Sequence, residues 1–488
     1  MKEIEEIYNT LAPKDIVKYY LWLFDDSWPK LPEGNEMKDY KKFEQIVTEK
    51  RIKALQDIKV KLGIKGLVKL AEQSKEPGIV GAITAEASLA NSEERCMFSL
   101  LCKKGNRVKF AQGYIRRKAL KNGDTWIKEV VDKALLERWD SIKIINLFLA
   151  FPQNRWIWNQ LEKFKTQIQK EYWERIQPMF FNLPLEDKIY ALQRLMYVKR
   201  YFTALDTAST FAKEVPPKLI VELLEKAALE RSSDDFRIVK PWHIEQLFKV
   251  LDQSDEIKKD EIAKLEWLYL HILASVESGR PPKMLHQRLS NDPEFFAEVI
   301  KWVYKPKNEN NEEAEEDMPQ EFKEQRTYLA WKLLHAWKTI PGSDSNGRIN
   351  YQKLKSWVKK AKKLCEKIDR LESCDTQIGQ VLAYSTPDED GNWPPEEVCR
   401  IIDNDEIRSK ELENGFIAGV FNKRGVVTKS PFEGGEQERA LAKKYREYSN
   451  KLAIQFPRTS AILKRIAEFY ENEGGREDKK AKRLDIEW

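Results

Sequence analysis

Apolar residues recur every three or four positions along almost the whole chain. One such stripe occupies i, i+3, i+4, i+7 and i+8, the spacing of a single helix face; it comprises Ile16, Tyr19, Tyr20, Leu23 and Phe24. Similar stripes lie within residues 189–196, 219–227 and 328–335. The alternation of apolar and polar residues that is typical of strands is scarce. The pattern therefore predicts an all-α protein.

Prolines and aspartates mark the expected starts of the helices, because proline fits the first turn and aspartate can cap it. The signals are Pro13 to Asp15, Leu183-Pro184, Pro216-Pro217, Pro281-Pro282, Asp292-Pro293 and Pro394-Pro395. Helices of about 12 to 20 residues joined by short turns are typical of α-solenoids. Residues 190–211 resemble one helix–turn–helix unit, but no fixed period is found. We expect an irregular helical-repeat solenoid of the TPR or HEAT kind, with a C-terminal helical lobe.

One acidic segment interrupts the helical pattern. Residues 308–318 read NENNEEAEEDM, with almost no apolar residue to bury. We expect a mobile linker there. It would divide the chain into a helical-repeat lobe, 1–307, and a C-terminal helical lobe with a basic surface, 319–488.

Composition narrows the class of protein further. The 488 residues are 41% hydrophobic, enough for sizeable cores, and the formal net charge of +6 is too small to indicate nucleic acid by itself. No apolar run approaches 18 residues and the start lacks a signal-peptide core. The five cysteines are widely spaced, which favours a reducing compartment. We expect a cytoplasmic protein without membrane contact.

Motifs for metals and nucleotides are incomplete. With Gly391 as the sixth position of a calcium loop, Asp388, Asp390 and Glu397 fall at ligand positions, but Thr386 stands at the first position. An Asp-Gly turn is the better interpretation. The chain has no phosphate-binding loop, and its histidines lack the spacing of zinc ligands. The sequence predicts no metal, no cofactor and no catalytic residue.

Arg280 and His286 form one weak catalytic candidate. Helical ribonucleases of the HEPN class carry an arginine and a histidine at about this spacing on one helix, where they bind phosphate and act as a general base. Two prolines follow Arg280, so it should precede the helix. We favour structural roles for both residues.

A basic set near the C-terminus is the main candidate for binding nucleic acid or a partner. It comprises Lys423, Arg424, Lys429, Arg439, Lys443 and Arg458. A cation that opens a helix opposes the helix dipole, so Arg458 should have an anionic partner. Because Glu433, Glu436 and Glu438 are near in sequence, we favour an internal salt-bridge network over contact with nucleic acid.

Several segments carry a resemblance to other proteins. LEWLYLHIL, RPPKMLHQRLSNDPEFFAEVI, IGQVLAYSTPDEDGNWP and GGEQERALAKKYREY resemble the C-terminal helical region of large, poorly characterised bacterial conflict or antiphage-defence proteins. The resemblance runs from about Trp126 onward. In such proteins the helical region accompanies an effector, such as a nuclease or nucleotide-hydrolysing domain. Because no effector segment is recognised here, the resemblance implies a stand-alone helical part whose effector is another polypeptide.

These observations give three functional hypotheses. The first is a non-enzymatic scaffold or recognition subunit of a bacterial antiphage-defence complex, which binds a protein partner: an effector or a phage component. The second is a nucleic-acid-binding subunit of such a complex, acting through the C-terminal basic set. The third is a HEPN-like ribonuclease.

The acidic segment gives a direct test of the predicted division. Limited proteolysis should cut first between Lys307 and Lys323, because a chain that buries no apolar surface is open to proteases. Mass spectrometry of the first fragments locates the cuts. Equally early cleavage throughout residues 1–307 would contradict the division.

Overall fold

The computed structural model confirms an all-α protein. It describes residues 13–31, 40–86, 89–180, 182–230, 240–275, 279–308, 319–344, 346–425, 427–430 and 432–486. Helices make up 72% of the structure, and 23 α-helices lie in the described residues. No strand occurs in these ranges; Ser343 and Ile349 form one isolated β-bridge. The predicted all-α class is therefore confirmed, whereas the solenoid arrangement stays a prediction.

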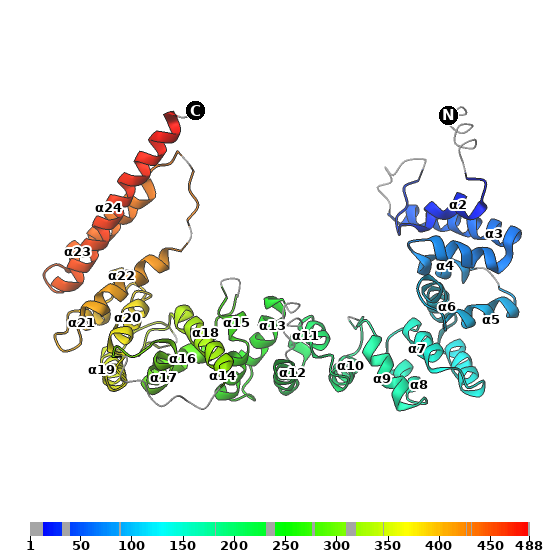
Figure 1. The fold of residues 1–488 in the computed structure, drawn as a ribbon, viewed down its shortest axis with the longest axis horizontal. Coiled ribbons are helices and arrows are strands. Elements are labelled where there is room, and N and C mark those ends of the chain that lie inside the picture. Colours follow the sequence, from blue (N-terminus) through cyan, green and yellow to red (C-terminus); the bar gives the residue numbers. More distant parts are fainter. Residues whose placement is uncertain are drawn as a thin grey trace. The chain divides into compact units, whose positions relative to one another are not determined.

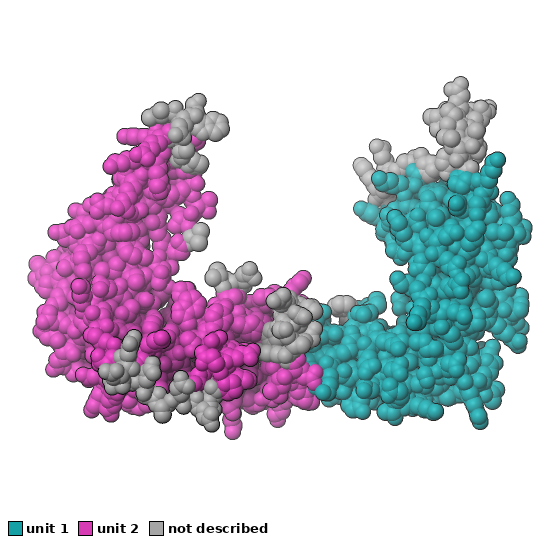
Figure 2. All heavy atoms as spheres, in the orientation of Figure 1, with its two compact units in different colours: residues 1–215 teal, residues 216–488 magenta. Residues whose placement is uncertain are grey.

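Two compact units divide the chain, Met1–Val215 and Pro216–Trp488 (Figure 2). This division differs from the predicted one at 308–318, a segment that lies, except for Asn308, outside the described residues. Phe296 before that segment and Trp337 after it belong to one hydrophobic core. The helices on both sides of the acidic segment therefore belong to the second unit. Composition alone does not distinguish a link between lobes from a loop within one.

The first unit consists of short and long helices in sequence (Figure 1). Its elements are α2 (Ile16–Tyr20), the 3-10 helix η1 (Leu21–Phe24), α3 (Tyr40–Gln73), α4 (Pro77–Thr84), α5 (Asn91–Leu100), α6 (Asn106–Leu136), α7 (Ser141–Ala150), α8 (Arg155–Leu161), α9 (Thr166–Arg175), α10 (Leu185–Tyr197), α11 (Tyr201–Ser209) and the 3-10 helix η2 (Ala212–Glu214). The stripe from Ile16 to Phe24 is thus an α-helix that continues as a 3-10 helix.

The second unit ends in its longest helix, α24. Its elements are α12 (Pro217–Leu229), α13 (Pro241–Asp252), α14 (Lys259–Leu268), α15 (Leu270–Leu273), α16 (Lys283–Asn291), α17 (Pro293–Val303), α18 (Gln320–Ala336), α19 (Tyr351–Lys367), α20 (Leu371–Leu382), α21 (Glu396–Ile402), α22 (Lys410–Arg424), α23 (Glu436–Leu452) and α24 (Pro457–Ile486).

The predicted start signals act at the expected places. The Asp15 side chain accepts a hydrogen bond from the Val17 N–H and caps α2. The Asp292 side chain caps α17 in the same way, accepting from the N–H groups of Glu294 and Phe295. The residues next to each start therefore determine where these helices begin, as the stabilising effect of N-cap hydrogen bonds predicts.

Two helix pairs pack backbone against backbone at glycines. A Cβ added to Gly81 of α4 would lie 2.7 Å from the Tyr114 nitrogen of α6, and would overlap the preceding turn of that helix. A Cβ added to Gly379 of α20 would lie 2.6 Å from the Phe416 nitrogen of α22. The later helix of each pair also contributes a glycine. Gly113 of α6 meets the Gly78 carbonyl of α4, and Gly415 of α22 meets the Thr376 carbonyl of α20. These contacts require residues without side chains.

Each pair is the first and third helix of a run of three, α4–α6 or α20–α22, which we call a glycine-packed triplet. The third helix of each triplet breaks or ends at a glycine. Gly123 interrupts α6 with φ 67° and ψ −161°, and Gly425 ends α22 with φ 67° and ψ −159°. This backbone region is open essentially to glycine alone. Each of these glycines follows its partner, Gly113 or Gly415, by ten residues. The triplets α4–α6 and α20–α22 therefore share the same kind of backbone contact and the same kind of glycine break.

The glycine contacts give a test of the fold. Gly415→Ala should destabilise the protein by about 1–3 kcal/mol, because the added methyl group would overlap the Thr376 carbonyl of α20. The matched control is Gly475→Ala in α24, where nothing lies within 4 Å of the added Cβ. It should stabilise the protein by about 0.5–1 kcal/mol. Urea unfolding measures both changes, and equal effects would contradict the packing argument.

Candidate functional site

Lys423, the first member of the predicted basic set, caps the end of another helix. Its Nζ lies 3.3 Å from the carbonyl oxygens of both Ala383 and Ser385, just after α20. The ammonium group also lies 5.3 Å from the centre of the Trp393 ring. Burial lowers the pKa of Lys423, and the charge of Lys444 lowers it further. Its donors are thus engaged by the protein itself.

Arg424 and Lys429 converge on one buried carboxylate. Both donate to Glu438, whose side chain is 3% exposed. Burial raises the pKa of the Glu438 carboxyl group, but the hydrogen bonds from Lys429 and Arg424 outweigh it and leave the pKa below its usual value. The loop before α23 is therefore held to that helix by a buried ion triad.

Arg439 and Arg458 are paired as well. Arg439 Nη1 lies 2.6 Å from the Asp478 carboxylate of α24, which also accepts the Gly435 N–H. Arg458 Nη1 lies 2.8 Å from Asp405. The anionic partner expected for Arg458 thus exists, but it is not one of the glutamates near in sequence.

The N-terminus of α24 receives a second carboxylate. Asp403 accepts hydrogen bonds from the Arg458 and Thr459 N–H groups at 2.9 and 3.0 Å. It lies 55 residues before Arg458 in sequence. A side chain so distant could not be selected from sequence, although an acidic cap at a helix start is favourable.

Lys443 remains unpaired within the described residues. It is exposed on α23, and no carboxylate of those residues lies within ion-pair distance. Four of the other five cations form ion pairs within the protein, as in the internal network that the sequence favoured, although Glu438 is the only one of the three expected glutamates among their partners. Lys423 bonds carbonyl groups instead. Binding of a partner or of nucleic acid by this set stays a prediction.

Arg280 is enclosed by acidic side chains. It is 1% exposed and bonds Asp252 through Nε and Nη2 and Glu266 through Nη2 at 2.7 Å. Burial raises the pKa of Glu266 despite the arginine charge. Since Arg280 precedes α16 and lies over the Phe248 ring, its role in this structure is to link three helices. A phosphate could not reach its guanidinium group.

His286 lies in the core on α16. It is 4% exposed, and burial lowers its pKa to about 3, with smaller contributions from Lys338 and Arg280. The imidazole is therefore neutral at physiological pH, and its Nε2 has no partner in the described residues. The pair does not form the open acid–base site that a ribonuclease needs.

The acidic loop after α20 forms the expected turn. The Asp388 carboxylate accepts the Asn392 N–H at 2.7 Å, and Gly391 has φ 75°. Across the described ranges, no group of three or more His, Cys, Asp or Glu side chains is placed to hold a metal ion. The turn explains the pattern of residues without calcium.

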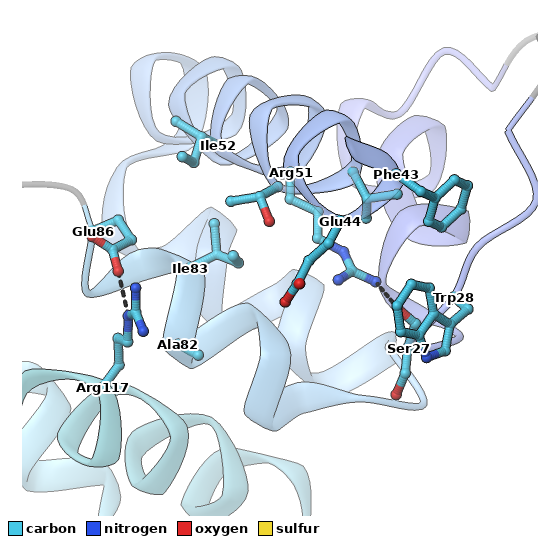
Figure 3. Close-up of a pocket in the computed structure, with 12 residues that line it drawn as sticks. Ser27, Trp28, Phe43, Glu44, Arg51, Ile52, Ala82, Ile83, Glu86 and Arg117 are labelled. Atoms are coloured by element: carbon cyan, nitrogen blue, oxygen red, sulfur yellow. Dashed lines mark hydrogen bonds and ion pairs between the residues drawn. The ribbon is translucent and has the colours of Figure 1, made fainter. Parts of the chain in front are cut away.

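A pocket in the first unit lies between α3, α4 and the segment after η1 (Figure 3). Its volume is about 580 Å³, and Trp28, Phe43 and Ile83 line it. Arg51 at its edge donates to the carbonyl oxygens of Leu23, Asp26 and Ser27. Its 6% exposure and these bonds make it another cap of a helix end. The pocket therefore lacks a free buried charge for a ligand.

The second unit contains a larger groove, which we call the tryptophan groove. Its volume is about 1010 Å³, and α14, α16 and α17 form its walls. The apolar lining consists of Ala263, Trp267, Leu268, Met284, Leu285, Phe295 and Trp302. The Trp267 and Trp302 rings meet edge to face, 5.7 Å apart. Lys259, Asp260, Lys264 and Arg288 form a mixed-charge rim.

Sequence reasoning missed the tryptophan groove. The sequence feature that could have indicated the groove is a set of aromatic residues and Met284 on three successive helices. Pattern alone did not show that these faces remain open, because openness depends on how the helices pack.

Comparison with known protein families, curated proteins and solved structures finds no match to this chain. Among the described helices, none has the length and apolar character needed to cross a membrane.

The buried triad of α23 gives a pH-dependent prediction. Glu438→Gln should destabilise the protein by about 1–3 kcal/mol at neutral pH, because two cations lose their carboxylate. The native pKa of Glu438 is lowered, so its contribution is full above the unfolded pKa and is lost as pH falls through the native pKa. The difference in free energy of unfolding between Glu438→Gln and the wild type should therefore shrink as the pH falls.

Urea unfolding between pH 3 and pH 7 measures this difference. The control is Glu436→Gln, an exposed residue two positions earlier on α23 without a described ion pair. It should change the free energy of unfolding by less than about 0.5 kcal/mol. A pH-independent loss in Glu438→Gln would argue against the ion triad.

Proposed function

We propose that the chain is a non-enzymatic scaffold that recognises a protein partner. The observation that carries this proposal is the tryptophan groove. Its floor combines tryptophans and a methionine, and its rim is charged, which is the composition of sites that receive side chains of a partner. A volume of about 1010 Å³ suits a few anchoring side chains of a helix or peptide.

The arrangement of ionisable groups supports a binding role over a catalytic one. Arg280, the predicted phosphate ligand, bonds two carboxylates, and His286 is buried and neutral. Five of the six basic candidates bond protein groups. An active site needs accessible groups with matched protonation states, and these residues do not offer them.

Successive helices favour an extended solenoid as the finer description of the fold. The two glycine-packed triplets share one kind of backbone contact, which supports the repeated use of one packing unit. Repeated units of this kind build long surfaces that suit the recognition of other proteins. On this proposal, the tryptophan groove is one anchor point on such a surface.

The resemblance to bacterial antiphage-defence proteins supplies the biological setting. We propose that the partner is a separately encoded effector or a phage component, which the chain holds or recognises. The sequence segments that carry the resemblance include LEWLYLHIL and RPPKMLHQRL, which contribute Trp267 and Met284 to the groove. The proposed partner site thus lies within the segments that carry the resemblance.

Truncation of the groove tests the function. The chain is purified from its native host with its associated protein, and the purified partner is then titrated calorimetrically. Trp267→Ala should weaken binding at least about 30-fold, the effect of losing about 2 kcal/mol from an aromatic anchor.

The matched control is Trp242→Ala, which removes a half-exposed tryptophan outside the groove. It should leave the affinity within about twofold, since peripheral residues contribute little. Equal affinities for wild type and Trp267→Ala, or equal losses in both variants, would refute the groove as the recognition site. Circular dichroism confirms that each variant is folded.

A further inference from the structure

Helix α19 has an unusually basic sequence. Among its 17 residues are seven lysines and a single acidic residue, Glu366. The lysines are Lys353, Lys355, Lys359, Lys360, Lys362, Lys363 and Lys367. None of them belongs to the C-terminal basic set. The local excess of positive charge is far greater than the chain average.

Four of these lysines form a single row. Lys355, Lys359, Lys363 and Lys367 follow one another at i, i+4 spacing, about 6 Å apart along the helix axis. The buried residues of α19 lie on its other side; they are Leu354, Trp357, Val358, Ala361 and Cys365. Like charges at this spacing destabilise a helix. An anionic ligand would reverse that cost.

Little in the described structure neutralises the row. Lys359 pairs with Glu406, and both side chains are about half exposed or more. Lys355, Lys363 and Lys367 have no carboxylate within ion-pair distance among the described residues. An exposed ion pair contributes little to stability, so a phosphate can replace Glu406 as the partner of Lys359 at a small cost in free energy.

Lys362 shows the contrasting, structural use of a lysine on the same helix. It is largely buried and donates to the Asp375 carboxylate and the Ile407 carbonyl, both at 2.7 Å. This lysine fastens α19 to its neighbours. The row on the exposed side has no such role.

A pocket adjoins the side of α19 that carries the row, which we call the lysine face. Its volume is about 510 Å³, and α19 contributes Gln352, Lys353, Ser356, Trp357 and Lys360 to its lining. Ser290 and Asn291 line the opposite side. Lysine, serine, asparagine and glutamine are the side chains that commonly contact phosphate oxygens. Gln352, Lys353 and Ser356 thus extend the donors of the row, whereas Lys360 pairs with Glu294 and the buried Ser290 hydroxyl donates to backbone carbonyls.

We propose that the lysine face of α19 binds the phosphodiester backbone of a nucleic acid. The row spans about 18 Å, over which a nucleic-acid strand presents several phosphates. Of the two aromatic residues of α19, Trp357 is 6% exposed and the Tyr351 ring is covered by the Arg400 guanidinium group, 4.1 Å from its centre, so neither is a free platform for stacked bases. Recognition is therefore electrostatic and independent of sequence.

Other anionic partners fit this face less well. Lysine is depleted at protein interfaces, whose centres are apolar and aromatic. A membrane-surface helix needs an exposed apolar side, whereas the apolar side of α19 is buried in the core. Backbone phosphates need only positive charge and polar donors, which the lysine face supplies.

Fluorescence anisotropy with the full chain tests the proposal. The probes are a 30-nucleotide single-stranded RNA and a 30-base-pair DNA duplex, each titrated at several salt concentrations. The variant combines Lys355→Gln, Lys363→Gln and Lys367→Gln. It should bind at least tenfold more weakly at low salt, and the slope of log K against log salt should fall by about 2–3, one per lost phosphate contact.

A matched variant controls for net charge. Lys451→Gln, Lys464→Gln and Lys479→Gln remove three exposed lysines of α23 and α24 that lie outside the C-terminal basic set, and they change the total charge equally. This variant should retain the wild-type affinity within about twofold. Replacement of the three row lysines by arginine should also retain binding, since charge is what the backbone requires.

The outcomes separate clearly. Binding of RNA alone, of DNA alone or of both supports the proposal and identifies the source of the phosphates. Absence of binding by the wild-type chain at low salt, an unchanged glutamine variant, or an equal loss in the control overturns it. Loss in the arginine variant also overturns it. Trp267→Ala should leave nucleic-acid binding unchanged, so this test is independent of the proposed protein partner.

Discussion

Unpaired carbonyl groups at helix ends are the constraint on which this structure depends. A chain of many short helices has many such groups, because the last four carbonyls of each helix lack partners within it. Cations from neighbouring helices supply the donors. Arg200 donates to the carbonyls of Trp173 and Ile176 at the end of α9, at 3.0 and 2.6 Å. Arg370 donates to the Tyr304 carbonyl after α17 at 2.7 Å.

This use of cations determines where function can lie. A buried guanidinium or ammonium group that donates to the carbonyls of a helix end cannot turn to a ligand without leaving those carbonyls unpaired. Arg51 is a buried cation of this kind, and Lys423, an exposed lysine that looked like a binding residue in sequence, also bonds helix-end carbonyls. The row on α19 is different, because its lysines end in solvent. Charge alone therefore does not identify a binding surface; the partners of each charge do.

Local chemistry explains what the sequence predicted well. The all-α class follows from spacing, and the Asp292 cap and the Asp388 turn each depend on residues within a few positions. The tryptophan groove and the Asp405 partner of Arg458 depend on contacts between distant segments. The row on α19 belongs to the first kind: its i, i+4 spacing is visible in sequence, but only burial shows that it faces solvent.

The two glycine-packed triplets show how one scaffold accepts different chemistry. In each triplet a lysine stands two residues before the glycine that breaks or ends the third helix, Gly123 or Gly425. This lysine contacts residues just after the end of the first helix, α4 or α20. Lys121 pairs with the Glu86 carboxylate at 3.0 Å, whereas Lys423 caps the Ala383 and Ser385 carbonyls. Backbone contact at the glycines fixes the helices in both triplets, so the surrounding side chains are free to differ. Residues that differ between the triplets, rather than the shared packing, are therefore the ones that can give each triplet a separate role.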